Sequence, residues 1–327
     1  MQRSKRFLLA AGAAGLLTAA LGLAPNSAHA QAYPTKEIRF ICAFPAGSGA
    51  DVLVRFFEKK IHEVSGKTII TENKAGAAGL VATKYVANAK PDGYTIFVHA
   101  GSAVANIPAL YKDPGIDVAK ALEVVGTINR QPFMIVVDAK SPYKTLADLT
   151  EAMKKKGDKA SYAYAATTGQ VMGEIYKVRA GLKAVGVRYG TATESLNDQL
   201  SGRVDFGAHD PVYSLAEERK GTLRILGVST DTRLDANPEM KTMKEQGIDM
   251  DLTGWWAAMV PAGTPKAVKD TLNGWFVKAM QDPETKKFLN SFGGDPLMES
   301  PEAAQKRLLK DIADWKEYVK LAHIEPQ

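Results

Sequence analysis

A short glycine-containing segment between an apolar run and an amphipathic run is the part of the sequence best suited to bind an anion. Residues 44–51 read Phe-Pro-Ala-Gly-Ser-Gly-Ala-Asp, after the apolar run 38–43 and before the amphipathic run 51–64. A strand that leads into a helix through Gly47 and Gly49 leaves the first helical amides without intrahelical partners, at the positive end of the helix dipole. The segment therefore predicts a site for a carboxylate or a phosphate.

A second polar loop, residues 166–170, repeats this arrangement. Its sequence, Ala-Thr-Thr-Gly-Gln, follows a predicted strand at 161–164 and precedes a predicted helix at 171–180. Thr168 could simply be the N-cap of that helix, which would require no ligand. Gly101-Ser102 opens a further loop after another predicted strand. Such loops gather at the C-terminal ends of strands, where α/β sheets bind their ligands.

Residue types that catalyse reactions or bind metals are present, but not in the patterns that those functions require. Among the five histidines, His99 and His209 end predicted strands, and Asp210 follows His209. Asp210 before Pro211 is sufficiently explained as a helix N-cap. No His-x-x-x-His pair, nucleophile elbow, Walker loop or dinucleotide fingerprint occurs. We therefore expect a binding protein without metal or cofactor; the enzymatic alternative is an exported hydrolase or isomerase using His99, His209 and Asp210.

The first thirty residues have the pattern of an export signal. A basic start with Arg3, Lys5 and Arg6 precedes the apolar run 7–24, and Ala28-His29-Ala30 matches a cleavage site. A membrane anchor is the alternative, but the run is rich in glycine and alanine. Because Arg3 and Arg6 are not adjacent, a twin-arginine route is not supported. We expect a Sec-type signal peptide, cleaved after residue 30, and a periplasmic mature protein.

Composition excludes several classes of function for the mature chain. Removal of residues 1–30 lowers the formal charge from +6 to +3, and the longest basic run is Lys154–Lys156. Nucleic-acid binding therefore has no electrostatic footprint. The single cysteine, Cys42, cannot form an internal disulfide. No later segment is apolar over the length that a membrane span requires.

Strand-like and helix-like segments alternate from residue 37 onward, which predicts an α/β fold with mainly parallel sheets flanked by helices. Two segments are interpreted as crossings between two lobes. The first is the polar segment 129–132, which separates the apolar runs 121–128 and 133–137, and the second is the apolar segment 252–260. The expected organisation is a signal peptide at 1–30, one lobe at 31–130 plus 256–327, and a second lobe at 131–255. Closure of two hinged lobes around a ligand is a known switching mode.

The order of motifs resembles that of the Bug family, the periplasmic solute-binding proteins of tripartite tricarboxylate transporters. The likeness covers essentially the whole mature chain. It rests on the following motifs: Tyr33-Pro34-x-Lys36-x-Ile38-Arg39, the 44–51 segment, Glu72–Gly79, Lys90–Thr95, Pro108–Tyr111, Gly202–Asp205, Leu223–Val228, and Trp255 ahead of Pro261–Pro265.

The resemblance implies a two-lobed periplasmic binding protein fold, a Venus flytrap of type II-like organisation. It also implies a monomer that presents a small organic acid, with one to three carboxylates or an aromatic body, to membrane permease subunits. The alternative is a receptor that signals to a membrane sensor instead of delivering the acid to a permease. Backbone amides and waters of two loops hold the ligand carboxylate in relatives. The expected ligand-binding residues are Phe44, Ala46, Gly47, Ser48, Gly49, Ala50, Asp51, Ser102, Thr167, Thr168, Gly169, Gln170, His209 and Asp210.

Three departures from the family pattern bear on the ligand. The first loop has Ser48 and Ala50 where relatives usually have Gly and Thr, and the second loop is about four residues shorter than the common version. Ala208-His209-Asp210 replaces the Phe-Asp-Asn of many relatives. The resemblance therefore implies the class of ligand but not its identity.

Overall fold

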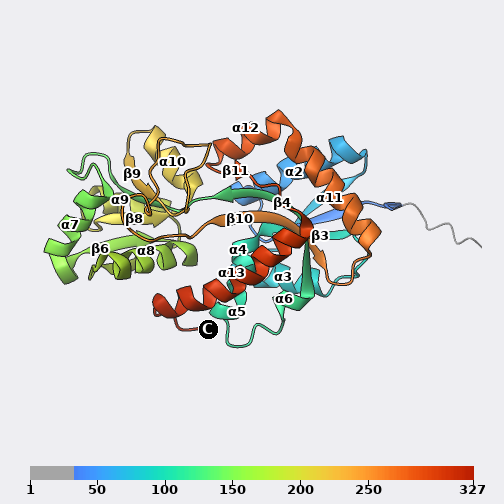
Figure 1. Ribbon diagram of the computed structural model, residues 1–327, viewed down its shortest axis with the longest axis horizontal. Helices are drawn as coiled ribbons and strands as arrows, with labels where there is room; N and C mark the ends of the chain where they lie inside the picture. Colours follow the sequence, from blue (N-terminus) through green and yellow to red (C-terminus); the bar gives the residue numbers. More distant parts are fainter. Residues whose placement is uncertain (1–32) are drawn as a thin grey trace, which may run out of the picture. The chain divides into compact units, whose positions relative to one another are not determined.

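The computed structural model describes residues 33–327, so the predicted signal peptide lies outside the described residues. Residues 36–327 form one compact unit that contains two β-sheets. Within residues 33–327, no helix has the length and apolar character needed to cross a bilayer. Each sheet is flanked by helices (Figure 1), which confirms the predicted two-lobed α/β fold.

The first sheet has six strands and carries helices on both faces. Helices α2, α11 and α12 lie on one face (Figure 1). The other face carries α13 and the shorter helices α3, α4, α5 and α6. The strand order is β11 (Asp295–Pro296), β4 (Leu122–Gln131), β10 (Gly254–Pro261), β3 (Thr95–Ala100), β1 (Ile38–Cys42), β2 (Ile69–Asn73). The helices are α2 (Gly49–Ser65), α3 (Leu80–Ala87), α4 (Gly101–Ala105), α5 (Ile107–Leu110), α6 (Val118–Ala121), α11 (Lys266–Gln281), α12 (Pro283–Ser291) and α13 (Pro301–Leu321), with the 3-10 turn η1 (Ala77–Gly79).

The second sheet has five strands. Its order is β7 (Val185–Arg188), β6 (Ser161–Tyr164), β8 (Phe206–His209), β5 (Met134–Asp138), β9 (Leu223–Val228). Its helices are α7 (Leu146–Lys156), α8 (Thr167–Ala180), α9 (Leu196–Leu200) and α10 (Pro211–Arg219), with the 3-10 turns η2 (Gly157–Lys159) and η3 (Thr193–Ser195).

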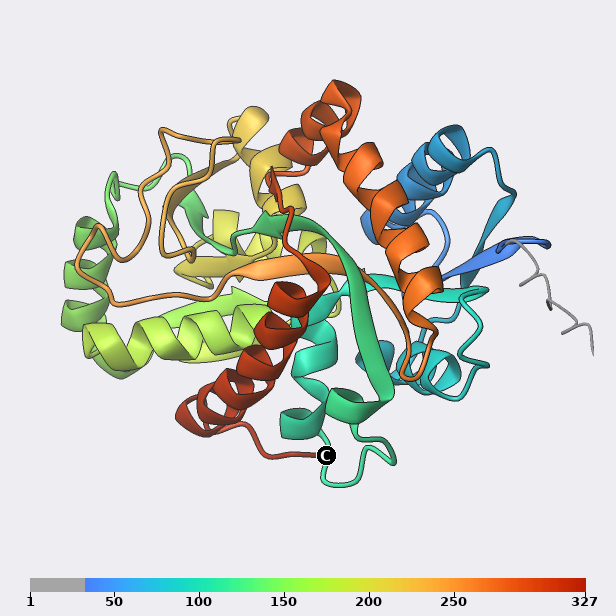
Figure 2. The ribbon, with the colours of Figure 1, turned by 45° about the vertical axis from the view of Figure 1, so that its right-hand side comes forward.

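The chain passes between the sheets twice, and these passages decide how the strands pair. β4 leads from the first sheet to β5 of the second, and β10 returns to the first sheet after residues 229–253. Figure 2 shows β4 and β10 running side by side through the middle of the molecule. Both pair antiparallel with their neighbours, whereas β1 with β2 and β3, and β6 with β7 and β8, are parallel. Both sheets are therefore mixed, but most strands of each sheet run in one direction, as predicted: only β10 and β11 oppose the others in the first sheet, and only β5 in the second.

Local sequence explains where several helices begin. Ser48 accepts the amide of Asp51 at the start of α2, and Thr145 with Asp148 forms a capping box at the start of α7. Asp210 caps α10 with Pro211 in the first turn, as predicted. These caps satisfy amides that would otherwise lack partners.

Three predicted boundaries were wrong. Gly101-Ser102 starts the short helix α4 rather than a loop, and the polar segment after β6 is the first turn of α8. A strand predicted at 204–206 instead runs from Phe206 to His209 as β8, and the Asp205 carboxylate before it accepts the amide of Ser161 and the ammonium of Lys156. The edge strand β11 was not expected, since two residues carry no readable pattern.

Candidate functional site

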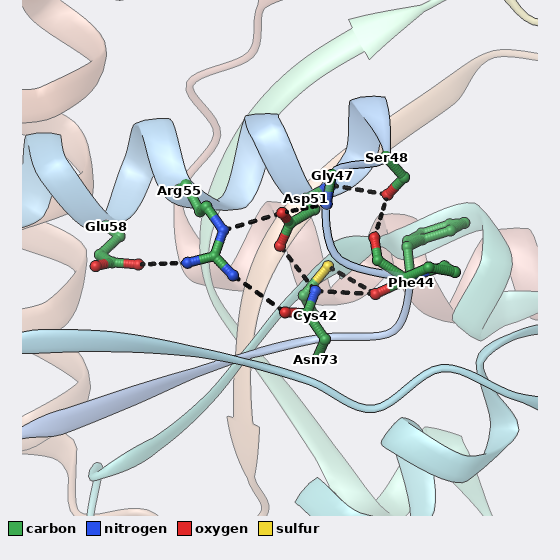
Figure 3. A network of polar contacts seen from close by, with 9 residues as sticks. Cys42, Phe44, Gly47, Ser48, Asp51, Arg55, Glu58 and Asn73 are labelled. Atoms are coloured by element: carbon green, nitrogen blue, oxygen red, sulfur yellow. Dashed lines mark hydrogen bonds and ion pairs between the residues drawn. The ribbon is translucent and has the colours of Figure 1, made fainter.

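The buried carboxylate of Asp51 organises the first loop from inside. Its Oδ2 accepts the Gly47 amide and the Arg55 Nε, both at 2.9 Å, and its Oδ1 accepts the Asn73 Nδ2 at 2.7 Å (Figure 3). Asn73 also donates to the Phe44 carbonyl at 2.9 Å. The loop that follows β1, the helix α2 and the strand β2 are thereby tied together around one side chain.

The charge of the Asp51 carboxylate is compensated within this network. Burial raises the pKa of the Asp51 carboxyl, but the bonds from Arg55, Asn73 and Gly47 outweigh it, so the pKa lies below its usual value. Arg55 is engaged with Asp51 and Asn73 and is therefore not directed at a ligand. The Asp51 side chain shapes the loop rather than contacting an anion.

Two amides of the first turn of α2 remain available. Ser48 donates to the Pro45 carbonyl, and the Asp51 amide is taken by Ser48 Oγ. Among the described residues, the amides of Gly49 and Ala50 have no hydrogen-bond partner. They lie at the positive end of a seventeen-residue helix, which is the arrangement that favours an anion.

The N-terminus of α8 offers a second set of available amides. Ala166 is the N-cap residue and makes no side-chain cap, so the interpretation of Thr168 as the N-cap was wrong. Gln170 donates to the Ala166 carbonyl, whereas the amides of Thr167, Thr168 and Gly169 have no partner within residues 33–327. Gly169 packs so closely on β8 that a Cβ atom there would lie 2.3 Å from the Ala208 carbonyl oxygen.

The first loop approaches the second half of the molecule at α10. A Cβ atom on Gly49 would lie 3.9 Å from Val212 Cγ1 and 4.0 Å from the Phe292 ring. Asp210, which is exposed, uses its carboxylate to accept the Tyr213 amide and thereby cap α10. The N-terminal ends of α2 and α10 therefore lie close together, with Asp210 at the second of them.

An aromatic group lies directly behind the first loop. The half-buried Phe44 ring lies 5.2 Å from the His99 ring and 6.0 Å from Trp256, between centroids. His99 is 1% exposed, and neither of its ring nitrogens has a hydrogen-bond partner among the described residues. Burial lowers the pKa of His99 to about 3, so the ring is neutral. The group formed by Phe44, His99 and Trp256 is therefore aromatic and uncharged, and Phe44 is its most exposed member.

His209 does not join this group. Its ring is 2% exposed, and its Nε2 lies 3.3 Å from both Ser195 Oγ and Gln199 Nε2. Burial lowers its pKa to about 4. His209 is enclosed by its own lobe, behind Asp210, so the two neighbours in sequence occupy different environments.

A cavity lies elsewhere in the molecule, away from the two loops. It measures about 620 Å³ and is bordered by α13 and the segments near the two crossings, including Arg130, Asp251 and Asp311. Of the site residues expected from the sequence, it includes only Ser102. Within residues 33–327, no group of three or more His, Cys, Asp or Glu side chains is placed to hold a metal ion.

Sequence reasoning missed Arg55, Asn73 and Trp256. Asn73 begins a glycine loop and Arg55 follows Asp51 by one helical turn, so their spacing permits a contact but does not indicate one. Only the parallel pairing of β1 with β2, which places Asn73 beside Cys42, brings Asn73 to the first loop.

The two buried histidines predict how stability depends on pH. Since the folded-state pKa values of His99 and His209 are depressed to about 3 and about 4, the unfolded chain binds protons first. The contribution of the neutral rings is complete above the unfolded pKa of about 6.5 and is lost as pH falls toward 4. As pH falls through this window, we expect protonation of each histidine in the unfolded chain to lower the unfolding free energy by up to about 1.4 kcal/mol per pH unit. Urea unfolding at pH 5 and pH 7 measures the effect; His99→Phe should flatten the dependence, whereas His62→Phe, at an exposed position, should not.

Comparisons with known proteins identify the family of this chain. Residues 53–323 match the model of the tripartite tricarboxylate transporter family receptor. A UPF0065 protein of Bordetella bronchiseptica is 30% identical over 94% of this chain and 91% of its own length. The solved structure of the periplasmic binding protein BugD is 27% identical, with a TM-score of 0.74 over 90% of this chain and 100% of that chain.

A structure of R. palustris Rpa4515 with adipate is 26% identical, with a TM-score of 0.79 over 90% of this chain and 100% of that chain. The family match covers most of the sequence, and the TM-scores show that the fold agrees with it. The chain therefore belongs to the receptor family of tripartite tricarboxylate transporters, the periplasmic solute-binding proteins of these systems.

Proposed function

We propose that this chain is an exported receptor that captures a small organic carboxylate between two lobes and delivers it to membrane permease subunits. One lobe comprises residues 31–130 and 256–327, and the other comprises 131–255. The signal peptide 1–30 is removed on export. The observation that carries the proposal is the pair of helix N-termini, α2 and α8, whose first amides have no partner within residues 33–327. The adipate bound to a relative supports a carboxylate as the ligand.

The proposed ligand contacts are backbone groups rather than cationic side chains. Ala46, Gly49 and Ala50 contribute from the first loop, and Thr167, Thr168 and Gly169 from α8. Phe44 borders the apolar body of the acid, and Asp210 borders its far end. Gly47, Ser48 and Asp51 act through the conformation of the first loop, because their polar groups already have partners. Gln170 acts through the first turn of α8, where its backbone amide donates to the Ala166 carbonyl. We assign Ser102, which also lines the separate cavity beside α13, only to the margin of the site, and the buried His209 to a position behind it.

Magnitudes are consistent with this model. A hydrogen bond to a charged group contributes roughly 1.5–3 kcal/mol. Three or four such bonds, less an association cost of several kcal/mol, can reach about −8 kcal/mol, the free energy of a micromolar complex. The dipoles of α2 and α8 further stabilise the bound anion, so the site requires no buried cation.

Isothermal titration calorimetry against citrate, adipate, malate, benzoate and inorganic phosphate tests the proposal. The protein is first unfolded and refolded to remove retained ligand. We expect at least one carboxylate to bind with a sub-millimolar dissociation constant and phosphate to bind more weakly. No binding by any organic acid to the folded protein would refute the proposal. We also expect mass spectrometry to recover the bound acid unchanged, and turnover would instead support an enzyme.

Gly47→Val tests the role of the first loop. A Cβ atom at Gly47 would meet nothing within 4 Å, so the cause of the effect is its φ of +79°, which a β-branched residue does not adopt readily. The substitution moves the amides that follow, and we expect roughly tenfold weaker binding of every acid, a loss of about 1.4 kcal/mol.

The matched control is Gly66→Val. Gly66 has a φ of +66°, equally open surroundings and a position at the other end of the same helix. It should lower stability by a similar amount while leaving the dissociation constants within about twofold of wild type. Equal loss of affinity in both variants would mean that the first loop has no special part in binding.

A further inference from the structure

Asp295 joins the two halves of the molecule through one buried carboxylate. It lies in β11, the edge strand of the first sheet, and is 5% exposed. Its Oδ2 accepts the Asp235 amide at 2.9 Å and Arg130 Nη2 at 3.3 Å, and its Oδ1 accepts the Ala236 amide at 2.8 Å. A carboxylate with three donors, one of them cationic, is well compensated for burial.

The two amides that Asp295 accepts belong to a segment packed on the second sheet. Leu234, two residues before Ala236, is buried, and it lies beside Met134 of β5 and Val228 of β9. The Val228 amide donates to the Lys241 carbonyl, which fastens the far end of the segment to the same sheet. The bonds to Asp295 therefore span from one sheet to the structure that covers the other.

The residues next to Asp295 also contact α10. A Cβ atom on Gly293 would lie 2.5 Å from Leu215 Cδ1 and 2.9 Å from Pro211 Cβ. Helices α12 and α10 lie next to each other in Figure 1 and Figure 2. The turn between α12 and β11 is thus inserted between α10 and residues 235–236. Pro211 directly follows Asp210, so this contact continues to the edge of the proposed ligand site.

We propose that Asp295 is a positioning residue for lobe closure. Its bonds to the Asp235 and Ala236 amides form in the closed arrangement and are broken when the lobes rotate apart. They contribute equally to the binding of every ligand, because they touch none. This inference rests on the proposed function only for its binding measurement, since closure is observable without ligand.

The primary test compares ligand-free wild type with Asp295→Asn by small-angle X-ray scattering and amide hydrogen exchange. Asparagine keeps the shape of the side chain, but its NH2 group cannot accept hydrogen bonds from the N–H donors that it then faces. We expect a larger radius of gyration and roughly tenfold or greater acceleration of exchange at the Asp235 and Ala236 amides. Asp231→Asn is the matched control, since Asp231 is exposed, lies in the same segment and makes only a 3.4 Å contact with Thr232. It should match wild type in both measurements.

A second variant and a binding measurement keep the inference testable if Asp295→Asn folds poorly. Gly293→Ala places a methyl group against Leu215 and should enlarge the radius of gyration while leaving Asp295 intact. Calorimetry with the acids that wild type binds should show dissociation constants raised by one common factor, roughly 10- to 100-fold.

Three results would overturn the inference: unchanged scattering and exchange in Asp295→Asn, unchanged scattering in a folded Gly293→Ala, or different factors for different acids. If no acid binds even to wild type, the proposed function fails, and scattering with exchange still decides whether Asp295 governs closure.

Discussion

Replacement of Asp51 by alanine is expected to lower the unfolding free energy by roughly 3 kcal/mol and to weaken binding of every carboxylate by roughly 100-fold or more. The substitution would remove the acceptor that holds the first loop in place. Three donors would lose their partner: the Gly47 amide, Asn73 Nδ2 and Arg55 Nε. A buried donor without an acceptor costs more than the bond itself contributed. Urea unfolding and calorimetry at pH 7 measure the two effects.

Glu58→Ala provides the control for Asp51→Ala. Glu58 lies on the same helix, and its Oε2 approaches Arg55 Nη1 only at 4.0 Å. The Glu58→Ala substitution removes the same charge but leaves the loop intact, so we expect the unfolding free energy to change by less than about 0.5 kcal/mol. The Asp51 contribution should be complete above its usual pKa of 3.8 and should be lost as pH falls through its lower folded value. A loop that still binds acids normally without Asp51 would contradict this account of the site.

Gly169→Ala is expected to weaken binding roughly tenfold and to lower the unfolding free energy by about 1–3 kcal/mol. The added methyl carbon would lie 2.3 Å from the Ala208 carbonyl oxygen, which belongs to a central strand and cannot move independently. The first turn of α8 must then shift away from β8, together with its available amides. Calorimetry with the acids bound by wild type, and urea unfolding, measure both consequences.

Gly274→Ala is the matched control for Gly169→Ala. Gly274 lies inside α11, and a Cβ atom there would meet nothing within 4 Å. Since alanine is the better helix former, this substitution should raise stability by about 1 kcal/mol and leave binding unchanged. If Gly169→Ala behaved like Gly274→Ala, close packing of α8 on β8 would not position the site.

The sequence alone was sufficient for the fold class and for the position of both loops. Alternating apolar runs and helix-start residues, such as Ser48, Thr145 and Asp210 with Pro211, mark where elements begin, because capping and apolar burial are local in sequence. The order of motifs added the family. The two crossings were also visible, as apolar runs on either side of 129–132 and at 252–260.

The tertiary structure decided which polar groups remain available. Whether Gly47 or Gly49 presents a free amide depends on Asp51, and the orientation of Asp51 depends on Asn73, which strand pairing brings from 22 residues away. The same holds for His209, whose type suggested a cleft residue until Ser195 and Gln199 enclosed it. Local patterns specify helices and strands; hydrogen-bond partners distant in sequence are specified by the packing of those elements, which no local pattern encodes.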